Sequence, residues 1–260
     1  MRRRTPTPEV MAISEHELTV MTRELDDLHN DVGMPAMHRA VDQWNEHTRS
    51  SRRGFLIGAG AVAGGALLAA CSSGSSSSTT TTTKAAAGGG VASLTGDLAV
   101  AGLAASLENL AVAAYGDVLT AAGANKLGTV PPAVATFVTT VKGQHAQHAQ
   151  AWNAAIVASG HHAVTEPDPV LTPVINADFA KVTDVTGAAQ LALMLENVAS
   201  QTYQTAVSAV KADSSIKVAA SIQPVEMQHA AILYFVLGQY PVPNAFNPTN
   251  DARTLSDIQR

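Results

Sequence analysis

Cysteine, aromatic residues and charge are all scarce in this chain of 260 residues. The single Cys excludes an intramolecular disulfide and leaves no dithiol chemistry. Aromatic residues make up 4% of the chain, charged residues make up 14%, and the net charge is −5. Beyond residue 70, eight Lys and Arg stand against twelve Asp and Glu, with no block of one sign. The sequence therefore excludes thiol redox enzymes and predicts no nucleic-acid partner.

The single cysteine follows an apparent export signal. Residues 51–56 (SRRGFL) contain the twin-arginine pair Arg52 and Arg53, and the apolar run that follows is too short and glycine-rich for a comfortable membrane span. The run ends in LAAC, which resembles the lipobox of bacterial lipoproteins, where the cysteine is lipidated. The alternative for Cys71 is an incidental buried thiol. We expect the twin-arginine machinery to export the chain and lipidated Cys71 to anchor it to the outer face of the bacterial cytoplasmic membrane.

The composition of the regions on either side of Cys71 gives little reason to expect a folded structure there. Residues 1–50 are polar and mixed in charge, with no sustained apolar period, so we expect residues 1–70 to be a discarded leader and assign no function to its first 50. A gene start placed too early is the alternative, because Met37 would give a leader of ordinary length. Residues 71–90 are rich in Ser, Thr, Ala and Gly, which bury too little apolar area to fold, and this predicts a flexible tether.

The composition of residues 91–240 predicts an all-α domain, and we expect residues 241–260 to form a C-terminal tail. Ala and Leu dominate the domain and strand-like alternation is missing. Breakers divide it into helices over about 95–122, 129–160 and 184–211, and a fourth that begins after 213–215 and stops at Gly238. Short turns make each consecutive pair antiparallel, and residues 161–183 are long enough to cross the bundle. The expected fold is an antiparallel four-helix bundle with a long crossover between helices two and three.

One stretch of this domain occurs twice. Residues 107–115 (LENLAVAAY) recur 88 positions later as 195–203 (LENVASQTY), with Leu-Glu-Asn and a Tyr seven residues after the Glu in both copies. A shorter string in the next helix follows each copy, HAQHA at 145–149 and EMQHA at 226–230. A carboxylate on one helix and a His-bearing i, i+3 pair on the next therefore occur twice, which suggests a metal site built in two halves.

The repeated glutamates lie on apolar helix faces. The neighbours of Glu108 and Glu196 at i±3 and i±4 are Ala, Leu, Val and Ser, so neither has a local basic partner. A carboxylate in such surroundings must be neutralised, hydrogen-bonded or bound to a metal. The second strings offer two i, i+3 pairs as partners: His145 with His148, and Glu226 with His229. For each residue alone, a satisfied core residue or an ordinary helix face is the alternative.

Tyr115 and Tyr203 lie two turns beyond their glutamates, on nearly the same helix face. Buried tyrosines of this kind usually pack in the core with the hydroxyl satisfied. The more specific interpretation is a hydrogen bond from each hydroxyl to a metal ligand, or a role in electron transfer.

In these motifs the sequence resembles the ferritin-like superfamily, in particular its exported ferritin-like domain proteins, over about residues 95–238. In di-metal members, one Glu comes from each of two helices and a Glu-x-x-His from each of the other two. The resemblance implies five ligands: Glu108, His148, Glu196, Glu226 and His229. It also implies iron or manganese, one or two ions, and an oxidase or peroxide-handling activity. The chain departs from the pattern at His145, where the family has Glu.

The histidine at this position changes the expected metal chemistry. Three carboxylates leave a net charge of +1 on two divalent ions, so a second ion should be held less tightly, and more imidazole favours zinc or copper. If His145 turns away from the core, one ion held by Glu196, Glu226 and His229 is expected, and a single ion should prefer that half. The alternative function is a metal-free scaffold that acts as an envelope binding or stress-protection lipoprotein.

Overall fold

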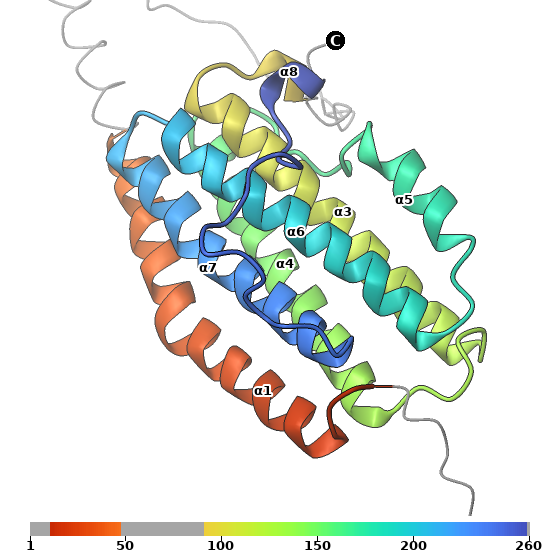
Figure 1. The fold of residues 1–260 in the computed structure, drawn as a ribbon. Coiled ribbons are helices and arrows are strands. Elements are labelled where there is room, and N and C mark those ends of the chain that lie inside the picture. The colour runs from red at the N-terminus through yellow and green to blue at the C-terminus, as the bar shows by residue number, and fades with distance from the viewer. Residues whose placement is uncertain (1–10, 48–90, 259–260) are drawn as a thin grey trace, which may run out of the picture.

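Four long helices form the body of the molecule, and Figure 1 shows them side by side. The computed structural model describes residues 11–47 and 91–258, and this part of the chain contains helices and no strand. The four helices are α3 (Asp97–Gly123), α4 (Pro132–Ala158), α6 (Val185–Ala209) and α7 (Asp213–Val236). The predicted all-α bundle is confirmed, and each helix begins and ends within a few residues of its expected limits.

The helices pack as two consecutive pairs, α3 with α4 and α6 with α7. Pro132 occupies the first turn of α4, where no amide hydrogen is needed. The Asp184 side chain accepts a hydrogen bond from the Gly187 amide and caps α6. The crossover between the pairs contains a short helix, α5 (Leu171–Phe179), which packs against α6 and α3. The long connection that the sequence predicted is therefore partly helical.

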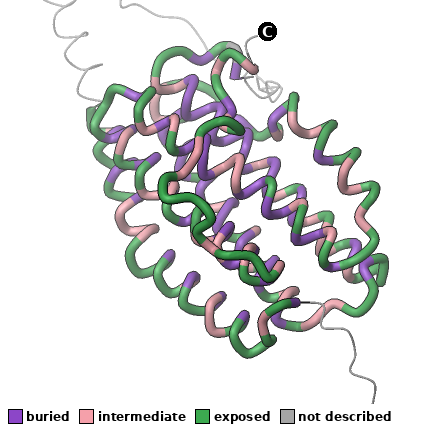
Figure 2. The backbone as a smooth tube through the Cα atoms, in the orientation of Figure 1, coloured by how far each residue is buried: buried purple, intermediate pink, exposed green. Residues whose placement is uncertain are grey.

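Helix α3 is apolar on nearly every side. By length and composition it could cross a membrane, but 78% of its most apolar stretch is buried inside the protein. Its composition is explained by its place in the bundle, where the other helices cover most of its surface. Figure 2 shows the same arrangement, with buried positions facing inward along the long helices.

Residues 11–47 add a long helical element beside the four-helix bundle, which corrects the expectation that this region lacks a regular apolar pattern. The element consists of α1 (Glu15–Leu28), a π-helical turn η1 (His29–Gly33) and an α-helix over residues 34–47. It lies along the bundle against α4 and α7 (Figure 1). A short 3-10 turn, η2 (Val91–Ser93), begins the second described range.

The local sequence explains why α1 forms. Ser14 and Glu17 make a capping box, in which each side chain bonds the backbone amide of the other residue. Leu18, Thr22 and Leu25 follow at helical spacing and are buried. Arg52, Arg53, Cys71 and the tether lie outside the described residues, so the export signal, the lipid anchor and the removal of residues 1–70 stay predictions.

The C-terminal residues return across α6 and α7 and end in a short helix, α8 (Leu255–Ile258) (Figure 1). The Arg253 guanidinium lies 3.2 Å from the Asp168 carboxylate, and the Asp168 side chain is fully buried. This ion pair fastens the tail to the crossover segment.

Candidate metal centre

Six buried side chains from four helices meet in the middle of the bundle. We call them the glutamate–histidine cluster; its members are Glu108, His145, His148, Glu196, Glu226 and His229. None of them exposes more than 2% of its surface. Apolar clusters lie on both sides along the bundle, one containing Trp152 and Ile222 and the other containing Phe137 and Leu233. The structure therefore gathers all six residues that the sequence singled out, in a site shielded from water.

The cluster contains two overlapping groups of four possible ligands. The first consists of Glu108, His145, His148 and Glu226. The second consists of His145, Glu196, Glu226 and His229. Within each group, one ligand atom from every residue lies within 4.8 Å of the others. His145 and Glu226 belong to both groups, so each group has four candidate ligands. Neither half of the site therefore has a more complete set of ligands than the other.

His145 points into the core and contacts both halves. Its Nδ1 lies 2.7 Å from Glu108 Oε2, and its Nε2 lies 3.2 Å from Glu196 Oε1. The alternative in which His145 turns away from the bundle is therefore wrong. The imidazole spans the space between the two repeated glutamates, where the family pattern has a carboxylate.

Each of the two repeated tyrosines contacts the glutamate of the other repeat rather than the glutamate of its own. Tyr203 donates a hydrogen bond of 2.5 Å to Glu108 Oε1, and Tyr115 donates one to Glu196 Oε1. Each tyrosine thus holds the glutamate of the other copy. Trp152 Nε1 donates to the Tyr203 hydroxyl at 2.8 Å, which fixes that ring in turn. These bonds orient both carboxylates: Tyr203 holds the Glu108 oxygen that the histidines leave free, and Tyr115 shares Glu196 Oε1 with His145.

Three buried atoms of the cluster have close neighbours but no aligned hydrogen bond. They are His148 Nδ1 and both carboxylate oxygens of Glu226. His148 Nδ1 lies 2.9 Å from Glu226 Oε1, and His229 Nδ1 lies 3.4 Å from Glu226 Oε2. Unpaired buried polar atoms are costly, and atoms that converge without hydrogen-bond alignment are arranged as ligands are around an ion. Imidazole nitrogens and carboxylate oxygens also form a donor set that suits first-row transition metals. The residues therefore fit a metal.

Mutual charge strongly perturbs the protonation of the cluster. Burial alone would raise the pKa of Glu108, but the adjacent His148 and His145 lower it to about 2. Burial alone would lower the pKa of His148, but Glu108 and Glu226 raise it to about 9. The same opposition raises the pKa of His145 and His229 and lowers that of Glu196. Without metal, three imidazolium ions can therefore neutralise three carboxylates.

These shifts predict how the stability of the metal-free protein depends on pH. The pKa of His148 is raised from 6.5 to about 9, so its stabilising effect is complete below pH 6.5 and is lost as the pH rises through 9. The pKa of Glu108 is lowered from 4.5 to about 2, so its effect is present above pH 4.5 and is lost as the pH falls through 2. Urea unfolding of chelator-treated protein should show a lower midpoint at pH 9 than at pH 6.

Metal should reverse this trend, because ligand histidines must be neutral and protons compete with the ion. The stabilisation by added metal should therefore grow from pH 6 to pH 9, which provides the control within the same experiment. A midpoint for metal-free protein that stays constant or rises over this range would contradict the charged cluster.

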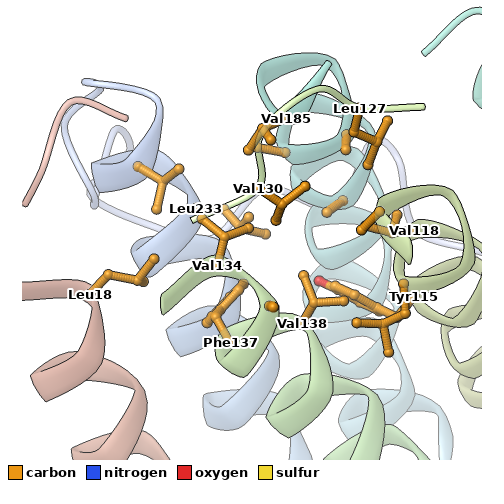
Figure 3. A pocket seen from close by; sticks show the side chains of 17 residues that line it. Leu18, Tyr115, Val118, Leu127, Val130, Val134, Phe137, Val138, Val185 and Leu233 are labelled. Atoms are coloured by element: carbon orange, nitrogen blue, oxygen red, sulfur yellow. The ribbon is translucent and has the colours of Figure 1, made fainter. Parts of the chain in front are cut away.

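An apolar cavity lies next to Tyr115, toward one end of the bundle (Figure 3). Its volume is about 40 Å³, and side chains such as Val118, Val134 and Leu233 line it. Its walls contribute no polar surface, so the cavity suits a small apolar molecule rather than an ion. Tyr115 separates this space from Glu196, which its hydroxyl contacts.

Sequence reasoning missed three polar residues that border the cluster: Asp26, His29 and Gln144. Gln144 is buried, and its Oε1 lies 2.8 Å from His229 Nε2. The position of Gln144 four residues before His148 gave a signal, since residues at this spacing share one face of a helix. Asp26 and His29 come from α1 and η1, and the spacing of Leu18, Leu25 and His29 was the available signal for their helix.

Comparison with known proteins identifies a family for the bundle. Residues 96–239 match the family model described as a ferritin-like domain, which covers the bundle and all six members of the cluster. No match was found among curated proteins or among solved structures.

Proposed function

The chain belongs to the ferritin-like domain family, and we propose that its glutamate–histidine cluster binds one or two transition-metal ions. The observation that carries the proposal is the set of unpaired atoms around Glu226, which converge without hydrogen-bond alignment. Glu108, Glu196 and Glu226 are the anionic ligands. His148 and His229 are neutral ligands, and His145 reaches both halves. Iron and manganese are the ions implied by the family resemblance, and the three imidazoles also suit zinc.

The reaction we propose is oxidation of the metal or of a small substrate by dioxygen or peroxide. A bound transition metal supplies the redox capacity and the Lewis acidity that this class of reaction needs. The protein contributes a water-poor site and fixed carboxylates, which Tyr115 and Tyr203 orient. The apolar cavity beside Tyr115 favours dioxygen, a small apolar molecule, as the oxidant.

We further propose that the protein works outside the cytoplasm. Arg52 and Arg53 before an apolar run, with Cys71 at its end, support export by the twin-arginine machinery and attachment to the outer face of the cytoplasmic membrane. Because that machinery carries folded proteins, the metal can be inserted before export.

The redox proposal predicts a specific loss of activity. Purified protein loaded with Fe²⁺ without oxygen should oxidise it on exposure to dioxygen or peroxide faster than buffer does. Glu196→Ala should react at the buffer rate, whereas Glu166→Ala should react like the unmodified chain, because Glu166 is exposed and lies outside the cluster. Absorbance of Fe³⁺ follows the reaction. Equal rates for the unmodified chain and Glu196→Ala would reject the redox function.

A metal-free scaffold is the second candidate, and the charge balance of the cluster favours it. The pKa values of all three histidines are raised, and those of Glu108 and Glu196 are lowered. The cluster can therefore persist without metal as a set of ion pairs. In that case the protein would act as a binding or stress-protection lipoprotein of the envelope.

A further inference from the structure

The N-terminal element is attached to the bundle on both sides of the metal centre. Toward one end, Leu18 and Leu25 join the apolar cluster that contains Phe137 and Leu233. Toward the other end, Met37, Ala40, Val41 and Trp44 join the second apolar cluster, where the Trp44 ring meets the Trp152 ring edge to face at 6.3 Å. The stretch between these two attachments lies beside α4 at the level of the cluster.

Asp26 lies in this middle stretch and is linked to the ligand His229 through Gln144. Gln144 Nε2 donates to Asp26 Oδ1 at 3.2 Å, and Gln144 Oε1 lies 2.8 Å from His229 Nε2. A carboxylate can only accept, so it selects the NH₂ end of the Gln144 amide. The carbonyl end must then face His229, which has to donate from Nε2. His229 Nδ1 is left to face the cluster, where it lies 3.2 Å from Glu196 Oε2. In the metal-free protein this nitrogen is also protonated and donates to that carboxylate, and a bound metal would take the place of its proton.

His29 supports the other half of the centre. Its Nε2 lies 2.8 Å from Gln147 Oε1, and its ring meets the His148 ring at 5.2 Å with an interplanar angle of 63°. His29 begins the π-helical turn, a local widening of the helix that often occurs at functional sites. The ring is 3% exposed and covers the outer side of His148.

From these contacts we propose that residues 11–47 are a fifth wall of the metal centre, in which Asp26 is a positioning residue that makes His229 a ligand through Nδ1. The proposal rests on the proposed metal-binding function. It assigns a role to a segment that the sequence placed in a discarded leader. If the chain is cut before Cys71, the remaining part either keeps residues 11–47 bound or holds its metal less tightly. The metal should therefore be bound before any such cleavage, while this segment is still attached.

Substitutions at Asp26 in the full chain test the proposal. Asp26→Ala removes the acceptor that orients Gln144, whereas Asp26→Asn keeps an oxygen that can accept the same bond. Asp27→Ala removes a carboxylate from the next residue, which is exposed, and serves as the matched control. The probe is Co²⁺, whose visible absorption reports on its ligands. We expect Asp26→Ala to weaken Co²⁺ binding at least about tenfold, while Asp26→Asn and Asp27→Ala stay within about twofold of the unmodified chain.

A second measurement reads the position of the His229 proton directly. In metal-free protein, at a pH high enough to remove one proton from His229, ¹⁵N NMR should find the remaining hydrogen on Nε2, and it should stay there in Asp26→Asn. In Asp26→Ala the Gln144 amide is no longer oriented, so part of the population should carry that hydrogen on Nδ1 instead. Equal Co²⁺ affinity in Asp26→Ala and Asp27→Ala, or equal weakening in Asp26→Ala and Asp26→Asn, would overturn the positioning role. An unmodified chain that binds no Co²⁺ would instead reject the metal-binding function, and the NMR result would still decide the orientation of His229.

Discussion

Glu226→Ala should lose metal binding more completely than substitution of any ligand that belongs to one group alone, because Glu226 is the carboxylate that both groups of ligands share. Both of its oxygens are buried and make no aligned hydrogen bond, and they face His148 Nδ1 at 2.9 Å and His229 Nδ1 at 3.4 Å, where an ion would be held. Loss of a residue that merely supports a ligand typically weakens metal binding 10- to 100-fold, and loss of this shared ligand should exceed about 100-fold. Calorimetric titration with Mn²⁺ or Zn²⁺ measures the effect.

The matched control is Glu166→Ala. Glu166 is the one glutamate beyond residue 90 that lies outside the repeated motifs, and it is exposed. Its substitution should leave metal affinity unchanged. If Glu226→Ala retains the affinity of Glu166→Ala, the ion does not bind at the cluster.

His145→Glu should have opposite effects on the metal-free and metal-bound proteins. In the metal-free state it replaces the imidazole between Glu108 and Glu196 with a fourth carboxylate. Breaking a buried ion pair by removing one partner costs about 3–5 kcal/mol, so the free energy of unfolding should fall by about this amount. With metal, four carboxylates balance two divalent ions, and the second ion should bind more tightly than in the unmodified chain.

His145→Gln separates the two effects of this substitution. It removes the same imidazole without adding a carboxylate, so it should lose stability as His145→Glu does but gain no affinity for a second ion. Urea unfolding with and without metal gives both quantities. A metal-free His145→Glu protein as stable as the unmodified chain would show that His145 does not neutralise the glutamates.

The sequence was sufficient for the bundle because each long helix carries its own signals. Pro132 begins α4, Asp184 caps α6 and Gly238 follows α7, and these local features fixed the boundaries within a few residues. The six cluster residues were also accessible, because two copies of one motif placed glutamates on apolar faces with no local partner.

The contacts between segments far apart in the chain could not be predicted from the sequence. Tyr115 lies seven residues after Glu108, about 10 Å along the helix, so it cannot reach that glutamate and instead contacts Glu196 across the bundle. The N-terminal wall was missed for a similar reason. Leu18 and Leu25 do recur at helical spacing, but charged residues separate them, and the surface they cover belongs to helices more than 100 residues away. Only the fold shows that this surface needs a partner.

Anomalous X-ray diffraction from crystals of the metal-loaded full chain is the most direct test of the central claim. Data collected at the absorption edge of the metal should show one or two peaks within coordination distance of Glu226. One position would be shared with Glu108 and His148, and the other with Glu196 and His229. Peaks only elsewhere, or no peak and an aligned hydrogen bond between His148 and Glu226, would contradict the account.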